Sequence, residues 1–179
     1  IAVNRFLNNG DIDYDKLIEI TGHITENLNN CMDINEYPTP EAELSNINAR
    51  PIGIGIQGVG DLLLELKIPY DSEEAICIES VIMETIYYAA LKKSMELARE
   101  DGAYSHFEGS NYSKGIMQFD MGYTLDRPLM HDWDTLKEQI KQYGTRNSLV
   151  TALMPTASTA QILGNMEGFE TITSNIYAR

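Results

Sequence analysis

Basic residues are scarce in this sequence. Its 179 residues include 13 Lys and Arg against 27 Asp and Glu, so the formal net charge is −14. A general nucleic-acid-binding protein needs a basic face, and this charge balance argues against one. Any phosphate-binding site must therefore be built locally, from backbone amides and hydroxyls, against an unfavourable overall field.

Cysteines and long apolar runs are also few. The two cysteines, Cys31 and Cys77, lie in no metal-ligand spacing, so we expect each to be a small buried apolar side chain in a reduced compartment. No stretch approaches the roughly 20 apolar residues of a membrane span, and none has the pattern of a signal peptide. The sequence therefore predicts a cytoplasmic protein without membrane contact.

The length and the ends of the chain indicate one segment of a larger protein. A hydrophobic content of 43% over this length allows a single sizeable core. The sequence opens in an apolar, helix-like stretch, IAVNRFLNNG, without an initiator Met, and it stops at SNIYAR without a capping signal. We therefore expect residues 1–179 to form one segment that is cut from a longer chain.

Hydrophobic spacing predicts three principal helices. One lies in residues 11–31, and a second, in HDWDTLKEQIKQYG, starts at Asp132 or Asp134 and stops at Gly144. The longest runs from about Ser72, as N-cap, to about residue 101. It is so apolar that we expect it to be buried on more than one side.

The remaining stretches predict loops and short strands. EYPTPEAELSNINARP is interrupted by three prolines and is expected to be a loop, and AYSHFEGSNYSKGIMQFDMGY to be a surface loop with one helical turn. IGIGIQGVGDLLLELKIPY is expected to be a buried strand that leads into a short helix, and TRNSLVTALMP a strand that feeds a helix in TASTAQILGN. This alternation predicts an α/β fold with parallel strands.

Several motifs have a structural interpretation that outweighs a functional one. GIGIQG matches GxGxxG, but its glycines occupy the expected strand, so we interpret them as allowing close backbone packing. The adjacent Tyr87 and Tyr88 lie in an apolar helix face and are expected to pack in the core. The histidines are scattered, and we expect no metal or catalytic role for His23, His106 or His131. Four acids are expected on the solvated start and face of a helix: Glu73, Glu74, Glu79 and Glu84.

The segment MPTASTAQILGN is different, because small hydroxyl-bearing residues stand where a strand turns into a helix. The first turn of a helix has unbonded N–H groups and a partial positive charge, and small residues let a phosphate approach the backbone. A plain Ser/Thr helix cap is the alternative. The residues alone thus indicate a possible anion site and no reaction.

Longer motifs carry a family resemblance. RPIGIGIQGVGDLLL, METIYYAAL, YGTRNSLVTALMPTASTAQILGN and TSNIYAR together closely resemble the large catalytic subunit of class I ribonucleotide reductase of the eukaryotic and viral type, and the likeness covers essentially the whole chain. The resemblance implies part of a ten-stranded α/β barrel, mainly its second half, with long buried helices. It also implies reduction of ribonucleoside diphosphates to 2′-deoxyribonucleoside diphosphates by thiyl-radical chemistry.

The resemblance further implies which functional parts this segment holds. The substrate diphosphate would be bound by Thr156, Ala157, Ser158 and Thr159. The radical cysteine, the redox cysteine, the allosteric specificity site and the ATP-binding region would all precede residue 1, and the tyrosine radical relay and the mobile cysteine tail would follow residue 179. We therefore expect no catalytic residue and no metal ligand in this chain, and no catalytic role for its two cysteines.

The implied partners are those of a multi-part enzyme. They are the remainder of the large subunit, the small subunit with its metal/radical cofactor, ATP and dNTP effectors, and thioredoxin or glutaredoxin as reductant. Two explanations of the segment stay open: a gene that is split or interrupted, so that separate chains reassemble, and a longer protein that was trimmed. A rival hypothesis is a non-catalytic interaction module that derives from a reductase fragment.

Overall fold

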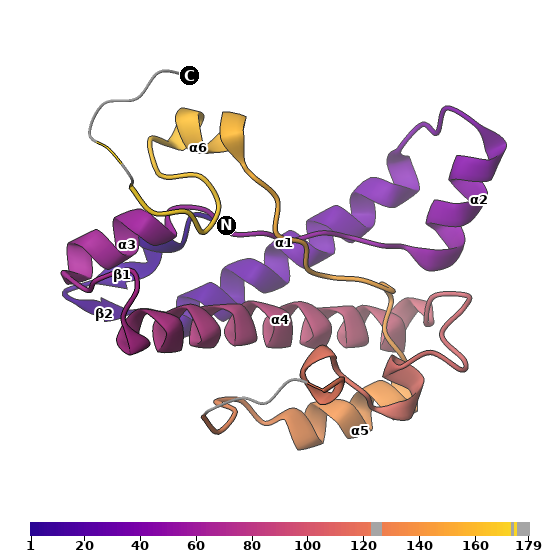
Figure 1. The fold of residues 1–179 in the computed structure, drawn as a ribbon. Helices are drawn as coiled ribbons and strands as arrows, with labels where there is room; N and C mark the ends of the chain where they lie inside the picture. The colour runs from indigo at the N-terminus through magenta and orange to yellow at the C-terminus, as the bar shows by residue number, and fades with distance from the viewer. Residues whose placement is uncertain (123–126, 173, 175–179) are drawn as a thin grey trace.

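Helices make up most of the part of the chain that the structure describes. In this computed structural model the described residues are 1–122, 127–172 and 174 (Figure 1). The helices are α1 (Tyr14–Ile34), α2 (Pro40–Ala49), α3 (Val59–Leu66), α4 (Glu73–Asp101), α5 (Trp133–Tyr143) and α6 (Ala157–Leu163). Three short 3-10 turns, η1 (Val3–Phe6), η2 (Tyr112–Lys114) and η3 (Gln118–Asp120), and a two-stranded antiparallel hairpin, β1 (Leu7–Asn8) with β2 (Asp11–Ile12), complete the elements.

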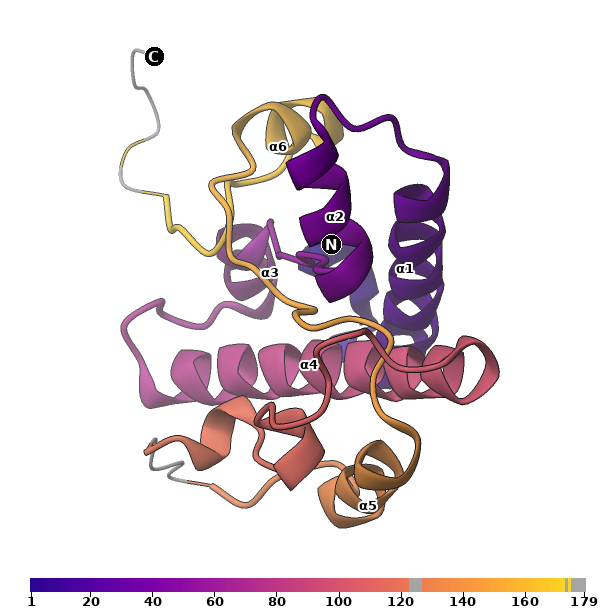
Figure 2. The ribbon, with the colours of Figure 1, turned by 90° about the vertical axis from the view of Figure 1, so that its right-hand side faces the viewer.

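The long helix α4 forms the centre of the fold. α1 packs on one side of it and α5 on the other, and both views show α4 running between them (Figures 1 and 2). The Ser72 hydroxyl accepts a hydrogen bond from the Ala75 amide at 3.1 Å, and Gly102, at φ 85°, ends the helix. The predictions of its two caps and of burial on more than one side are confirmed.

The core lies along α4. Tyr87 of α4 is 8% exposed, and its ring lies 5.6 Å from that of Trp133 on α5. Tyr88 is half-buried and stacks edge-on against the same indole. The expectation that both tyrosines pack in the core is therefore confirmed. Residues buried almost completely include Leu17, Ile82, Ile86, Leu91, Leu136, Ile140 and Val150.

Residues 36–51 correct the prediction of a loop. α2 occupies most of them, and Thr39 caps it by accepting a hydrogen bond from the Ala42 amide at 3.2 Å. Pro40 is its first residue, a position where the missing N–H has no cost and the fixed φ suits a helix. A proline that starts a helix was thus mistaken for one that breaks it.

The α/β prediction is only partly met. Residues 1–3, 52–57 and 149–152 run side by side, and the amides of Ile52 and Ile54 donate to the carbonyls of Leu149 and Val150 at 3.0 Å each. These contacts amount to isolated parallel bridges, Ala2 with Gln57 and Ile54 with Thr151. The described residues are therefore mainly helical with few strands, and they do not display a ten-stranded barrel. Strand pairing depends on distant neighbours, so local patterning overstates it.

The glycines of GIGIQG have the packing role that we predicted. A Cβ on Gly55 would lie 2.5 Å from the carbonyl oxygen of Ala152, and one on Gly53 would lie 3.0 Å from the Ala152 Cβ. Only glycine lets the two extended segments approach this closely. The segment that carries MPTAST is therefore held against residues 52–57.

Two further expectations are corrected. Cys31 and Cys77 are both exposed and free on the surface of this chain, where we expected buried thiols. Residues 103–122 are more than a surface loop, because Tyr104, Phe107 and Met117 are buried against the α4–α5 unit.

Candidate functional site

The segment Leu153 to Thr159 forms an exposed turn between an extended segment and a helix. The chain leaves the parallel contact at Ala152 and reaches Thr156, whose φ of 58° and ψ of 21° place it in the left-handed region. α6 then begins at Ala157. The structure thus brings residues 156–159 together at the start of a helix, next to the end of the extended segment.

The backbone of this turn has unused donors. The amide of Ala160 bonds the Thr156 carbonyl at 2.8 Å, which closes the first helical turn. Within the described residues, the amides of Ala157, Ser158 and Thr159 before it donate to no acceptor. Because Ser158 and Thr159 are exposed and Ala157 is half-buried, solvent or a ligand can reach these donors.

The three hydroxyls of the turn differ in their partners. The Thr156 hydroxyl accepts from the Gly168 amide at 2.8 Å, so it tethers the turn to residues that follow α6. The Thr159 hydroxyl donates to Oε1 of Gln57 at 2.9 Å. The Ser158 hydroxyl has no partner in the described part of the chain and stays free for a ligand.

Sequence reasoning missed Gln57, a site neighbour that is only 3% exposed. Besides its bond to Thr159, it donates from Nε2 to Oδ1 of Asn165 at 3.0 Å. It lies inside GIGIQG, where we considered only the glycines. A polar residue within an apolar, glycine-rich stretch was the signal that could have indicated Gln57. A buried side-chain amide needs hydrogen-bond partners, so such a residue is expected to contact other polar groups.

Glu84 is not the solvated helix residue that we predicted. It is 8% exposed, and its Oε1 accepts from the Trp133 indole at 3.0 Å and from the Met130 amide at 2.7 Å, while Oε2 lies 2.6 Å from Arg127. Burial alone would raise the pKa of this carboxyl, but the hydrogen bonds outweigh it and lower the pKa. Glu84 is a structural ion-pair residue between α4 and the segment before α5.

The other acids and histidines have mixed outcomes. Glu73 and Glu74 are exposed as predicted, whereas Glu79 is half-buried and burial raises its pKa. His131 stacks on Tyr88 at 4.6 Å, and desolvation lowers its pKa despite the nearby Glu84. His23 is exposed on α1, and His106 is exposed beyond α4. In the ranges that the structure describes, no group of His, Cys, Asp and Glu is placed to hold a metal ion.

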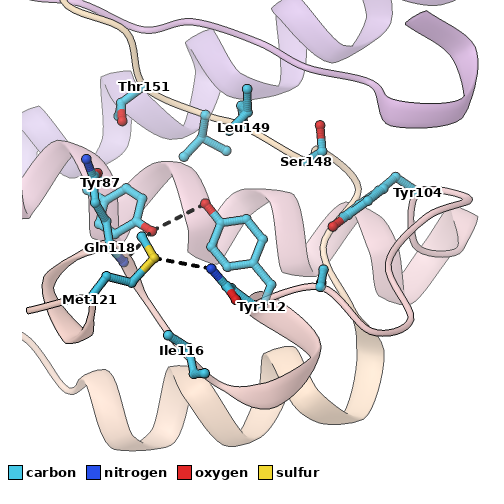
Figure 3. A pocket seen from close by; sticks show the side chains of 12 residues that line it. Tyr87, Tyr104, Tyr112, Ile116, Gln118, Met121, Ser148, Leu149 and Thr151 are labelled. Atoms are coloured by element: carbon cyan, nitrogen blue, oxygen red, sulfur yellow. Dashed lines mark hydrogen bonds between the residues drawn. The ribbon is translucent and has the colours of Figure 1, made fainter. Parts of the chain in front are cut away.

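A separate cavity of about 360 Å³ lies between α4, the 110–121 segment and residues 148–151. Figure 3 shows the hydroxyls of Tyr87 and Tyr112 pointing toward each other inside it, 3.3 Å apart. Desolvation raises the pKa of both phenols, so they stay neutral, and every other lining residue is also uncharged. A cavity without a cation or free amide cluster does not suit a phosphate, so the turn at 156–159 is the better candidate for an anion site.

A family comparison agrees with the motifs. The family model described as ribonucleotide reductase, barrel domain, matches residues 1–179. The chain belongs to this ribonucleotide reductase family. Its barrel-domain membership covers α1 to α6 and the turn at 156–159 alike.

Relatives of the ribonucleotide reductase chain come from viruses and eukaryotes. It is 51% identical to the ribonucleoside-diphosphate reductase large subunit of Variola virus, over 100% of this chain and 23% of that protein. It is 53% identical to the large chain from Cryptosporidium parvum, again over 100% of this chain and 22% of that protein. The large subunit of Caenorhabditis elegans is 51% identical over the whole chain. The chain thus spans less than a quarter of the length of these relatives.

None of the helices within the described residues is both long and apolar enough to cross a membrane. Even α4, the longest at 29 residues, carries charged side chains along its length.

Proposed function

We propose that residues 1–179 form one segment, the C-terminal part of the barrel domain, of a ribonucleoside-diphosphate reductase large subunit. The whole enzyme would reduce ribonucleoside diphosphates to 2′-deoxyribonucleoside diphosphates. In it, this segment would supply much of the second half of a ten-stranded α/β barrel. Family membership over all 179 residues carries this proposal, together with relatives that bear that name.

The local task of the segment is to bind the substrate diphosphate. Thr156, Ala157, Ser158 and Thr159 would form the binding turn, with the free amides of the last three as donors. An anion next to the first turn of a helix is favoured by those unbonded N–H groups and by the helix dipole. The free Ser158 hydroxyl would add a donor, while the left-handed Thr156 turns the chain from the extended segment into α6.

The reaction needs parts that this segment does not supply. The resemblance assigns no catalytic residue to it, and the exposed thiols of Cys31 and Cys77 match no cysteine of the reaction. The resemblance implies that the metal/radical cofactor would reside in the small subunit. Turnover would require the remainder of the large subunit, the small subunit, ATP or dNTP effectors, and thioredoxin or glutaredoxin.

A charge placed in the turn tests the diphosphate site. Ser158→Glu in the complete large subunit should raise the KM for ribonucleoside diphosphates about tenfold or more, because like charges about 4 Å apart cost roughly 1–4 kcal/mol. Ser105→Glu is the matched control, since Ser105 is exposed on the loop after α4 and lies outside the turn. Equal KM values for Ser158→Glu and the control would contradict diphosphate binding here.

The rival function, a non-catalytic interaction module, has one observation in its favour. Large apolar side chains are exposed on the 149–154 segment and on α6, for example Leu153 at 53% and Ile162 at 81%. Mixing this chain with one that carries the remainder of a large subunit separates the two functions. Restored CDP reduction supports the reductase segment, whereas stable association without reduction under any reductant supports the module.

A further inference from the structure

The buried side chain of Gln57 links both ends of α6. Its Oε1 accepts from the Thr159 hydroxyl in the first turn, and its Nε2 donates to Asn165 just beyond the last turn. Its main chain is fixed as well, because the Gln57 amide donates to the Ile1 carbonyl at 2.8 Å and its carbonyl accepts from the Val3 amide at 2.9 Å. Gln57 therefore reaches from a fixed extended segment and holds the helix at two points.

α6 depends on such polar contacts for its position. It has seven residues, and isolated helices this short are unstable. Ala160 is its one buried residue, whereas Ile162 is 81% exposed. Apolar packing within the chain therefore contributes little to where the first turn of α6 lies.

The hydrogen bonds around Gln57 run in one direction. Asn165 donates from Nδ2 to Oδ1 of Asn4 at 3.3 Å, Gln57 donates to Asn165, and Thr159 donates to Gln57. A threonine hydroxyl has a single proton. The other acceptor that the Thr159 hydroxyl can reach is the Thr156 carbonyl oxygen at 3.1 Å, so both of its acceptors lie within the chain. The Thr159 proton is therefore occupied internally, while that of Ser158 is free.

We propose that Gln57 is a positioning residue for the substrate diphosphate. By accepting the Thr159 hydroxyl proton, it fixes the first turn of α6 with the amides of residues 157–159 facing the anion. Thr159 then contributes its backbone N–H alone, and Ser158 is the hydroxyl donor to the ligand. This inference rests on the proposed function, and it deepens it by assigning a different task to each hydroxyl.

The test compares variants of the complete large subunit. Gln57→Met keeps the length of the side chain and removes both hydrogen bonds. It should raise the KM for a ribonucleoside diphosphate about 3- to 10-fold, the effect of one or two lost hydrogen bonds. The inhibition constant of inorganic pyrophosphate should rise by the same factor, with kcat changed by less than about twofold, since ligand binding and not chemistry is affected. Gln142→Met, on the exposed end of α5, is the matched control.

Thr159 variants identify the bond that matters. Thr159→Val should raise the KM in the same direction as Gln57→Met and by no more than that variant, because it removes only the bond to Gln57. The double variant should be no worse than Gln57→Met, which already lacks that bond. Thr159→Ser keeps the hydroxyl and should stay close to wild type. If Gln57→Met does not fold, Thr159→Val, at an exposed position, tests the same bond.

Three outcomes would overturn the assignment. The first is unchanged KM and pyrophosphate inhibition in Thr159→Val while Ser158→Glu raises both; the positioning role then fails and the diphosphate site stands. The second is Thr159→Ser behaving like Thr159→Val, which removes the hydroxyl from the explanation. The third is no response to Ser158→Glu, in which case the proposed function itself fails.

Discussion

Buried polar residues join elements that are far apart in the sequence. Arg50 is 3% exposed and has a φ of 46°, just after α2. Its guanidinium donates to Asn29 and to Asp33 of α1, and its carbonyl accepts from Nδ2 of Asn147 at 3.0 Å. This residue thereby fixes the start of the segment that leads to the turn at 156–159. Because an unpaired buried charge is costly, such a site tolerates few substitutions.

Replacing Glu84 should lower the stability of the protein in a pH-dependent way. Its folded-state pKa lies below the ordinary Glu value of 4.5, so its contribution to stability is fully present above that value and is lost as the pH falls through the lowered pKa. Glu84→Gln should reduce the free energy of unfolding at pH 7 by about 1–3 kcal/mol, since it weakens the charge-assisted hydrogen bond from Trp133 and removes the ion pair with Arg127. The difference from wild type should shrink as the pH is lowered below 4.5.

Denaturant unfolding at several pH values measures both effects. Glu108→Gln is the control, because Glu108 is exposed on the loop after α4. A Glu84→Gln deficit that persists unchanged at acid pH would show that the carboxylate charge is not its source.

At the level of the structural elements, replacing glycine by alanine at two positions should have opposite effects on stability. Gly22 lies inside α1, and an added Cβ would meet just the Lys93 side chain at 3.7 Å, an ordinary contact. Gly22→Ala should therefore stabilise the protein by about 0.5–1 kcal/mol. A Cβ on Gly55 would lie 2.5 Å from a backbone oxygen that cannot move aside, so Gly55→Ala should destabilise it by about 1–3 kcal/mol. Thermal unfolding of the two variants checks the signs, and a Gly55→Ala variant that is as stable as wild type or more stable would refute the close approach of the two segments.

Local signals explain which elements the sequence predicts well. α4 and α5 carry their own caps, Ser72 with Gly102 and Asp132 with Gly144, and the structure has both helices with those caps. α2 was missed because a proline can start a helix as well as stop one. The strands were overstated because parallel pairing depends on segments that lie far away in the chain.

The site was predictable only in part for the same reason. The position of residues 156–159 at a strand-to-helix turn follows from their own sequence. The bond of Thr159 to Gln57 joins residues that are 102 positions apart, and the burial of Glu84 depends on an indole 49 positions away. Neither separation leaves a periodic signal in the sequence.

Across the whole molecule, net charge and exposed apolar surface have opposite effects on self-association. The charge of −14 makes copies of this chain repel one another. Exposed apolar side chains on the 149–154 segment and α6 favour association, and among them Leu149 is 60%, Leu153 53% and Ile162 81% exposed. In the proposed large subunit, other parts of the barrel would cover this surface.

This balance predicts self-association of the isolated chain that depends on salt. Salt screens the repulsion but not the apolar attraction, since the Debye length falls from about 30 Å at 0.01 M to about 3 Å at 1 M. Light scattering after size exclusion should therefore give a mass above the 20.1 kDa monomer, and the mass should rise with ionic strength. Leu153→Glu with Ile162→Glu should restore the monomer, whereas Ser105→Glu, which adds charge outside the apolar surface, should not. A compact monomer of 20.1 kDa at every salt concentration would mean that the exposed apolar side chains drive no association.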